Sequence, residues 1–126
     1  MSVETQKVEW DELTLLVEAG PLATTVRWQG ISEVQDPENS VGQFLRGLIP
    51  KLSGHKLVMN FLALEYMNSA TVQPLLRMLR ALNDNQIPTE IVYDADIDWQ
   101  RVSFRLIKTV SATLPYIRVM EKREAS

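Results

Sequence analysis

Two β-rich apolar runs stand near the start of the chain, at Leu13–Ala19 and Leu22–Gly30. Each is rich in Leu, Val and Thr, which favour extended backbone, and Gly20-Pro21 between them is a strong turn signal. The pattern therefore predicts a β-hairpin.

A helical pattern follows this hairpin. Asp36-Pro37-Glu38 resembles a helix start, with proline at the first helical position and an acid in the first turn. Pro50 is expected to kink or end the helix, and Ser53-Gly54 to close it. The apolar residues fall at spacings of three, four and seven and predict one buried helical face: Val41, Phe44, Leu45, Leu48, Ile49 and Leu52.

The central segment joins an apolar strand to a second amphipathic helix. Leu57–Leu62 is almost continuously apolar, which is typical of a strand covered on both faces. A polar hinge follows at Asn68–Thr71, and Pro74 favours a helix start with Thr71 as the cap, since Pro74 would then lose no hydrogen bond. Asn83 or Asn85 could end the helix in a left-handed conformation. One helical face is apolar: Val72, Leu75, Leu76, Leu79 and Leu82.

The last third of the chain predicts a strand at Thr89–Asp94, a helix within Ala95–Leu114 and a short strand at Tyr116–Glu121. Asp96 or Asp98 would cap this helix. Its expected core face comprises Val102, Leu106, Val110 and Leu114. The resulting order, β-β-α-β-α-β-α-β, predicts an α/β fold with a mixed, mostly parallel sheet.

The length and composition of the chain exclude several classes of function. The 126 residues suit one domain, spanning 1–126 with a core from about 13 to 120. The net charge of −3 and the absence of a basic block argue against nucleic acid. The chain has no cysteine, and neither a signal-peptide pattern nor an apolar run long enough for a membrane span, so a cytoplasmic protein without membrane insertion is expected.

Enzyme chemistry finds little support. His55 is the chain's single histidine, so a metal site or a Ser-His nucleophile system is not expected. Asp94, Asp96 and Asp98 alternate as in some calcium loops, but the glycine and terminal glutamate of such a loop are missing. There is no glycine-rich phosphate loop. We expect no cofactor, no metal and no catalytic activity.

The hinge admits two interpretations. Asn, Ser and Thr are preferred helix caps, because their side-chain oxygens accept hydrogen bonds from the first turn. A serine at a helix start can also carry a phosphate, which the positive end of the helix dipole tolerates and an acidic or apolar partner surface does not. Both interpretations place Ser69 at the start of a helix.

The strand, hinge and helix resemble the STAS domain, the fold of the bacterial anti-sigma factor antagonists. Leu57–Phe61 takes the place of the family's strand, and Tyr66–Thr71 that of its Asp-Ser-Ser/Thr-Gly motif. The resemblance extends from about Leu13 to Met120 and implies helices packed mainly on one side of the sheet. It also implies that a partner kinase phosphorylates Ser69, with Thr71 as the second choice.

Other residues are placed by the same resemblance. Gly30 matches a glycine that begins a family loop, and Glu33 an acid shortly after it. This sequence departs from the family at Asn60 and Asn68, which replace aspartates, and at Thr71, which replaces a frequent glycine. The partner-binding residues that we expect are Asn68, Ala70, Thr71, Glu33, Asp94, Asp98, Trp99 and Arg101.

Three functions follow from this resemblance. The first is an anti-sigma factor antagonist in a bacterial partner-switching pathway, binding a serine-kinase or anti-sigma regulator until Ser69 is phosphorylated. The second is a constitutive binding subunit, for example of transport machinery, which Asn60 and Asn68 favour. The third is a small-ligand sensor with a pocket near Gly30 and Ser69. A homodimer is left open.

Overall fold

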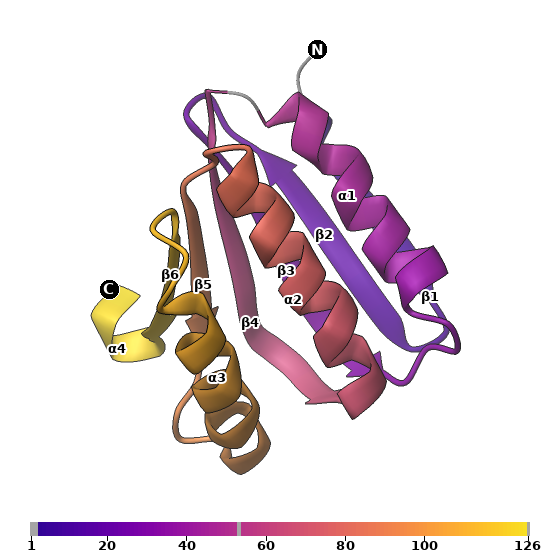
Figure 1. The fold of residues 1–126 in the computed structure, drawn as a ribbon. Coiled ribbons are helices and arrows are strands. Elements are labelled where there is room, and N and C mark those ends of the chain that lie inside the picture. The colour runs from indigo at the N-terminus through magenta and orange to yellow at the C-terminus, as the bar shows by residue number, and fades with distance from the viewer. Residues whose placement is uncertain (1–2, 53, 126) are drawn as a thin grey trace.

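A six-stranded sheet forms the centre of the computed structural model, which describes residues 3–52 and 54–125. The strands lie in chain order across the sheet (Figure 1): β1 (Gln6–Trp10), β2 (Leu13–Ala19), β3 (Ala23–Ser32), β4 (Lys56–Met67), β5 (Thr89–Tyr93) and β6 (Ile117–Glu121). The pairs β1–β2 and β2–β3 are antiparallel, whereas β3–β4, β4–β5 and β5–β6 are parallel. The expected hairpin and the mixed, mostly parallel sheet are confirmed.

β1 is absent from the expected order. It pairs with β2 from Gln6 opposite Val17 to Trp10 opposite Leu13. Its sequence, Gln-Lys-Val-Glu-Trp, has polar residues at three of five positions because it is an edge strand. Trp10 packs edge-on against Phe44, with ring centroids 5.7 Å apart, and so closes one end of the core.

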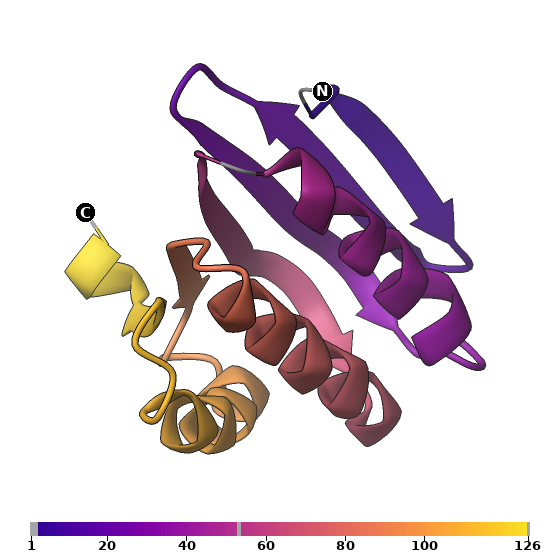
Figure 2. The same ribbon diagram turned by 45° about the horizontal axis from the view of Figure 1, so that its top comes forward.

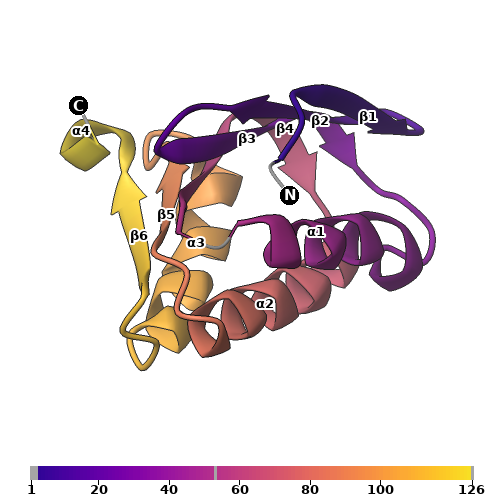
Figure 3. The same cartoon turned by 90° about the horizontal axis from the view of Figure 1, so that it is seen from above.

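The helices lie mainly on one side of the sheet. They are a π-helical turn (Glu38–Gly42), α1 (Gln43–Leu48), a 3-10 turn (Ile49–Lys51), α2 (Ser69–Asp84), α3 (Asp98–Ser111) and α4 (Lys122–Ala125). α1 and α2 run side by side across one face, and α3 lies next to α2 (Figures 2 and 3). α4 continues from β6 at the sheet's edge, where the sequence suggested only a polar tail.

One face of the sheet is covered, so the expectation that β4 is covered on both faces is wrong. Leu57, Met59 and Phe61 are fully buried, whereas Val58 and Leu62 on the opposite face are half-buried. The helices contact the first set only, because successive residues of a strand point to opposite faces. Because nearly all of these residues are apolar, the sequence does not show which of them are buried and which are half-buried.

The first helical segment begins differently from the expected start. Pro37 lies at the N-cap position rather than the first helical position, and the first turn is π-helical. The expected apolar face is buried except for Phe44, which is half-buried. Pro50 lies in the 3-10 turn that ends the segment. Gly54 has φ +78°, and Ser53 lies outside the described residues.

α2 begins earlier than the sequence suggested. Asn68, not Thr71, is its N-cap, and Pro74 therefore lies inside the helix. Pro74 has no N–H, so the hydrogen bond to the carbonyl of Ala70 is missing. Gly42 makes room for the proline ring, because a Cβ there would lie 3.3 Å from Pro74 Cβ. At the other end, Gln86 rather than an asparagine takes the left-handed conformation, with φ +56°.

Candidate functional site

Ser69 is the first residue of α2, directly after β4. Asn68 has extended backbone, and its Oδ1 accepts hydrogen bonds from the Thr71 N–H at 3.1 Å and the Thr71 hydroxyl at 2.7 Å. Asparagine therefore retains the capping role that an aspartate would have. Ser69 makes no contribution to the cap, and its side chain is exposed.

Thr71 has a buried structural role. Its side chain is 1% exposed, and its oxygen lies 2.7 Å from the Ser32 hydroxyl, which is also buried. Because the Thr71 hydroxyl donates to Asn68, Ser32 donates to Thr71. This chain of hydrogen bonds ties the end of β3 to the start of α2. Thr71 is thus closed to a partner or kinase in this structure, whereas Ser69 is open.

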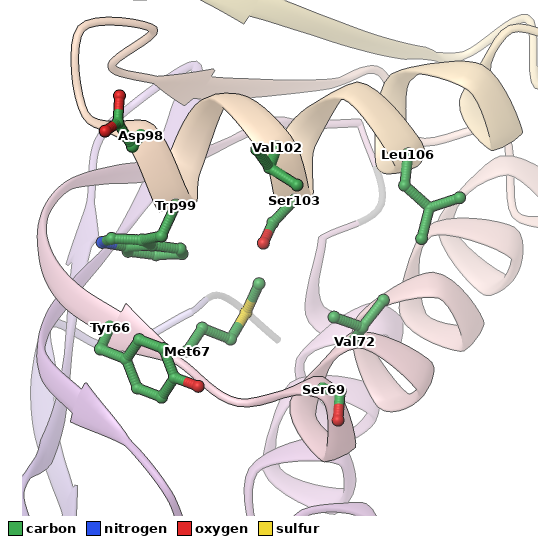
Figure 4. A pocket seen from close by; sticks show the side chains of 9 residues that line it. All are labelled: Tyr66, Met67, Ser69, Val72, Asp98, Trp99, Val102, Ser103 and Leu106. Carbon is green, nitrogen blue, oxygen red and sulfur yellow. The ribbon is translucent and has the colours of Figure 1, made fainter.

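An apolar groove of about 690 Å³ lies beside Ser69, between α2, α3 and the end of β4 (Figure 4). Several apolar side chains that line it are exposed: Tyr66 by 43%, Val102 by 63% and Leu106 by 54%. Exposed apolar residues that cluster in this way mark interaction surfaces. The groove is lined by Tyr66, Met67, Ser69, Val72, Asp98, Trp99, Val102, Ser103 and Leu106.

The face of α3 that the apolar spacing predicted to be buried is not the face that packs on the sheet. Val102 and Leu106 were expected in the core but lie in the groove, while Val110 and Leu114 are half-buried. The buried face instead comprises Gln100, Phe104, Ile107 and Ser111. α3 has two apolar stripes, and only one of them can face the sheet. The second stripe forms one wall of the groove.

Gln100 is a buried residue that the sequence did not single out. It is fully buried, and its side-chain nitrogen donates to the carbonyls of Phe61 at 2.8 Å and Leu64 at 3.0 Å. Its side-chain oxygen accepts the Asp94 N–H at 2.8 Å. β4 and β5 pair only as far as Asn60 and Val92, so Gln100 bonds to β4 where the ladder has ended. A glutamine in an amphipathic helix carries no sequence signal of burial.

Trp99 connects the groove to the core. It is half-buried and packs edge-on against Tyr66, with centroids 6.1 Å apart. It also contacts Phe104 at 6.5 Å, and Phe104 contacts Phe61 at 4.8 Å. The indole N–H of Trp99 is buried without a hydrogen-bond partner among the described residues. Trp99 therefore both holds α3 in place and forms part of the groove wall.

The charged candidates divide between different surfaces. Asp98 lines the groove and pairs with Arg101 at 2.9 Å; Arg101 also donates to the Ala95 carbonyl at 3.2 Å. Neither Asp96 nor Asp98 caps α3, whose N-cap position is Ile97 with no side-chain hydrogen bond. Asp94 lies outside the groove lining, and its Oδ1 accepts the Asp96 N–H at 2.9 Å.

Glu33 and Gly30 also lie away from the groove. Glu33 lines a separate depression of about 200 Å³ with Asp11, Glu12 and Ile31. Gly30 lies within β3 and not in a loop, at a register shift between β3 and β4. Its φ of +87° and a Cβ position only 2.0 Å from the Glu12 carbonyl require glycine. Of the remaining candidates, Ala70 is exposed beside Ser69 without lining the groove.

Tyr93 is the last residue of β5, and burial raises the pKa of its hydroxyl above the ordinary value. The carboxylates of Glu121 and Glu124 raise this pKa further, against a smaller lowering by Arg105.

Within residues 3–52 and 54–125, no group of three or more His, Cys, Asp or Glu residues could hold a metal ion. No helix of that part is long and apolar enough to cross a membrane.

Comparison with solved structures shows which known fold this chain shares. The chain is similar to an anti-sigma factor antagonist from Mycobacterium paratuberculosis, with a TM-score of 0.60 and 16% identity over 84% of this chain and 85% of that one. It is also similar to the anti-sigma factor antagonist SpoIIAA in its unphosphorylated form, with a TM-score of 0.58 and 18% identity over 88% of this chain and 91% of that one. The chain folds as a STAS-like domain.

A third similar structure is the complex of the diguanylate cyclase SiaD with its activator SiaC from Pseudomonas aeruginosa. The TM-score is 0.62 at 16% identity, covering 92% of this chain and 98% of the matched chain. No protein-family model matches the sequence, and a sequence search finds no significant match among curated proteins. The STAS-like fold is thus shown by structural similarity.

Proposed function

We propose that this STAS-like domain is a regulatory protein–protein interaction module, and that its partner binds in the groove beside Ser69. The observation that carries the proposal is the position of Ser69: an exposed hydroxyl at a helix start, on the rim of an open apolar groove. The similar structures support a regulatory role, since two are named as anti-sigma factor antagonists and one contains an activator of a diguanylate cyclase.

Phosphorylation of Ser69 would control this binding. A phosphate adds about −1.5 to −2 charge at neutral pH. The first turn of α2 tolerates that charge, because its N–H groups and helix dipole favour anions. An apolar partner segment seated against Tyr66, Val72 and Val102 would have to bury the same charge, which is strongly unfavourable. The switch would therefore act on binding and leave the fold intact.

The proposed partner is a cytoplasmic protein of the serine-kinase or anti-sigma type. Trp99 and Tyr66 supply the aromatic surface that is common at binding hot spots. Asp98 and Arg101 lie at the start of α3, where a partner's polar groups would pack around the apolar contact. Asn68 would adjust the rate of phosphorylation rather than prevent binding, because its oxygen is committed to Thr71.

The test is capture of partners from the native cytoplasm with wild type, Ser69→Ala and Ser69→Glu, followed by mass spectrometry of the partners and of the Ser69 peptide. Gln43→Glu is the matched control, since Gln43 is exposed at the first residue of α1 and does not line the groove. A kinase-type partner retained by Ser69→Ala and Gln43→Glu, lost by Ser69→Glu, and accompanied by phosphate on Ser69, would support the switch. Equal retention by all variants with unmodified Ser69 would instead identify a constitutive binding module.

A further inference from the structure

The free positive charge of this acidic chain is concentrated at one edge of the sheet. Seven of its 13 cationic side chains form ion pairs with described carboxylates. Within residues 3–52 and 54–125, the cations without such a pair are Lys51, Arg80, Arg105, Lys108, Arg118 and Lys122. All but Lys51 and Arg80 fall between residues 105 and 122, on α3, β6 and α4.

Two of these cations line the same depression. It has a volume of about 230 Å³ and lies between the end of α3 and β6; its lining comprises Lys108, Ser111, Ala112, Ile117, Arg118 and Val119. None of the lining residues is acidic. On the neighbouring strand β5, Glu90 is in register with Arg118, and its carboxylate already pairs with Lys56 at 2.6 Å.

The backbone around this depression favours an anion more than a helix C-terminus usually does. Free carbonyls at a helix end carry negative partial charge and repel anions. Here the carbonyls of Lys108 and Ser111 accept the N–H groups of Ala112 at 3.0 Å and Leu114 at 2.9 Å. The carbonyl of Val110 accepts the Thr113 hydroxyl at 3.1 Å. These bonds occupy three carbonyls at the end of α3, so an anion in the depression would face fewer free carbonyl oxygens.

A polar group in the depression also lacks a partner. The side chain of Ser111 is 3% exposed, and its hydroxyl makes no hydrogen bond with any described residue. An unsatisfied buried hydroxyl is unfavourable, and rotation of the Ser111 side chain toward the depression would let a carboxylate there supply the missing acceptor.

β6 adds a strand edge to the site. It is the last strand of the sheet, and the Tyr116 carbonyl accepts the Thr89 N–H, on the side of β5. On the outer side, Ile117 donates its N–H to Leu114 and Glu121 donates to the Glu124 carboxylate. Backbone groups of alternate residues point to the same side, so those of Val119 lie on the outer edge between two occupied positions. A short extended segment could pair there, as in β-strand addition.

We propose that the edge between α3 and β6 binds an acidic, extended peptide segment of a protein partner. Its backbone pairs with Val119, and its carboxylates contact Lys108 and Arg118. A peptide fits better than a free anion, because the site combines two separated cations with a strand edge and the apolar side chains of Ala112 and Ile117. This site shares no lining residue with the groove beside Ser69 and does not depend on the function proposed for it.

The test is an NMR titration of the isotope-labelled chain with a blocked hexaglutamate peptide, in parallel with blocked hexalysine and inorganic phosphate. Hexaglutamate should give saturable shifts at the amides of Val119, Ser111 and Ala112. The double variant Lys108→Glu/Arg118→Glu should weaken this binding by about tenfold or more. Lys51→Glu/Arg80→Glu, which changes the charge equally at the other two unpaired cations, should leave it unchanged.

Three results would overturn the proposal. Equal weakening by the control pair would show non-specific attraction to net charge. Equal shifts with hexalysine would exclude charge complementarity. The same shifts with phosphate at the same concentration would assign the site to small anions instead of a peptide. Thermal unfolding of both double variants checks that each is folded, and because the altered side chains are charged and largely solvent-facing, stability should change little.

Discussion

The side-chain nitrogen of Gln100 lies 2.8 Å from the carbonyl oxygen of Phe61, and this contact joins α3 to β4 beyond the last β4–β5 pair. Two residues of the groove follow from these elements: Trp99 precedes Gln100 on α3, and Tyr66 lies further along β4. A buried amide thereby positions an exposed aromatic pair whose ring centroids are 6.1 Å apart.

Replacing Gln100 by leucine should destabilise the fold by about 3 kcal/mol. The change leaves the carbonyls of Phe61 and Leu64 unpaired, and each buried polar group left unpaired costs about 1 to 3 kcal/mol. Urea unfolding measures the difference, with Gln73→Leu on the exposed face of α2 as the control. Equal stability of Gln100→Leu and wild type would show that the bonds contribute no net stabilisation.

Charges placed in the groove should abolish partner binding without unfolding the domain. Val102→Asp and Leu106→Asp alter side chains that are 63% and 54% exposed, so the free energy of unfolding should change by about 0.5 kcal/mol or less. Capture of the partner from native cytoplasm should be lost, because a carboxylate cannot be buried in an apolar interface without large cost. Thr109→Asp, exposed on α3 outside the groove lining, should retain the partner. Loss with all three variants would place the interface elsewhere on α3.

Asn68 should tolerate aspartate better than alanine. Asn68→Ala removes the acceptor for Thr71 and should cost about 1 kcal/mol, whereas Asn68→Asp keeps the acceptor and adds a favourable charge at the helix start. Chemical denaturation compares the three proteins. We also expect Asn68→Asp to raise the phosphorylated fraction of Ser69 in native cytoplasm, because a carboxylate there can orient the hydroxyl or contact a kinase-bound metal. A lower fraction would contradict this role.

Gly30 and Gly54 offer a matched pair of substitutions. Both have positive φ, but a Cβ at Gly30 would lie 2.0 Å from the Glu12 carbonyl, while a Cβ at Gly54 meets nothing within 4 Å. Gly54→Ala should therefore cost only backbone strain, about 1 kcal/mol. Gly30→Ala should cost about 3 kcal/mol or more, because β2 and β3 must separate. Similar melting temperatures for the two variants would contradict the close approach.

Tyr93 should make the fold sensitive to alkaline pH. Its pKa is raised in the folded state, chiefly by burial, so the folded protein holds the phenolic proton more tightly than the unfolded chain does. The resulting stabilisation is present below the unfolded pKa of about 10 and is lost as the pH rises through the folded pKa. Phenylalanine has no proton to lose, so the free energy of unfolding of Tyr93→Phe should not fall in this way. Above about pH 10, the variant should therefore gain stability relative to wild type. Unfolding curves at several pH values, with Tyr116→Phe as the control, measure it; a constant difference would contradict the shift.

Periodicity predicted most of the sheet and the positions of the major helices, because their apolar faces are long and regular. It did not distinguish the two apolar stripes of α3: Phe104 and Ile107 reach the sheet, and Val102 and Leu106 do not. It also missed Gln100, whose partners are backbone carbonyls nearly 40 residues away in the chain. Such pairings depend on where β4 stops pairing with β5, which no local pattern encodes.

For the candidate site, the motif predicted that Ser69 lies at a helix start, which the structure confirms, but Pro74 in the sequence favoured Thr71 rather than Asn68 as the cap. The groove itself was not predictable, since its walls come from three elements. Likewise, the sequence left Thr71 as a second choice of phosphoacceptor. Only the three-dimensional contact with Ser32, on a strand 39 residues earlier, shows that its hydroxyl is enclosed.

Pro74 weakens the connection between the first turn of α2, which carries Ser69, and the rest of the helix. Without an N–H at this position, the turn shares one fewer hydrogen bond with the rest of α2, which is anchored by Leu75, Met78 and Leu79 in the core. Local opening needs less free energy where fewer bonds must break. The first turn of α2 is therefore held to the sheet mainly through the buried hydrogen bond between Thr71 and Ser32, and breaking that bond would let the residues around Ser69 unwind while the remaining turns of α2 stay packed on the sheet.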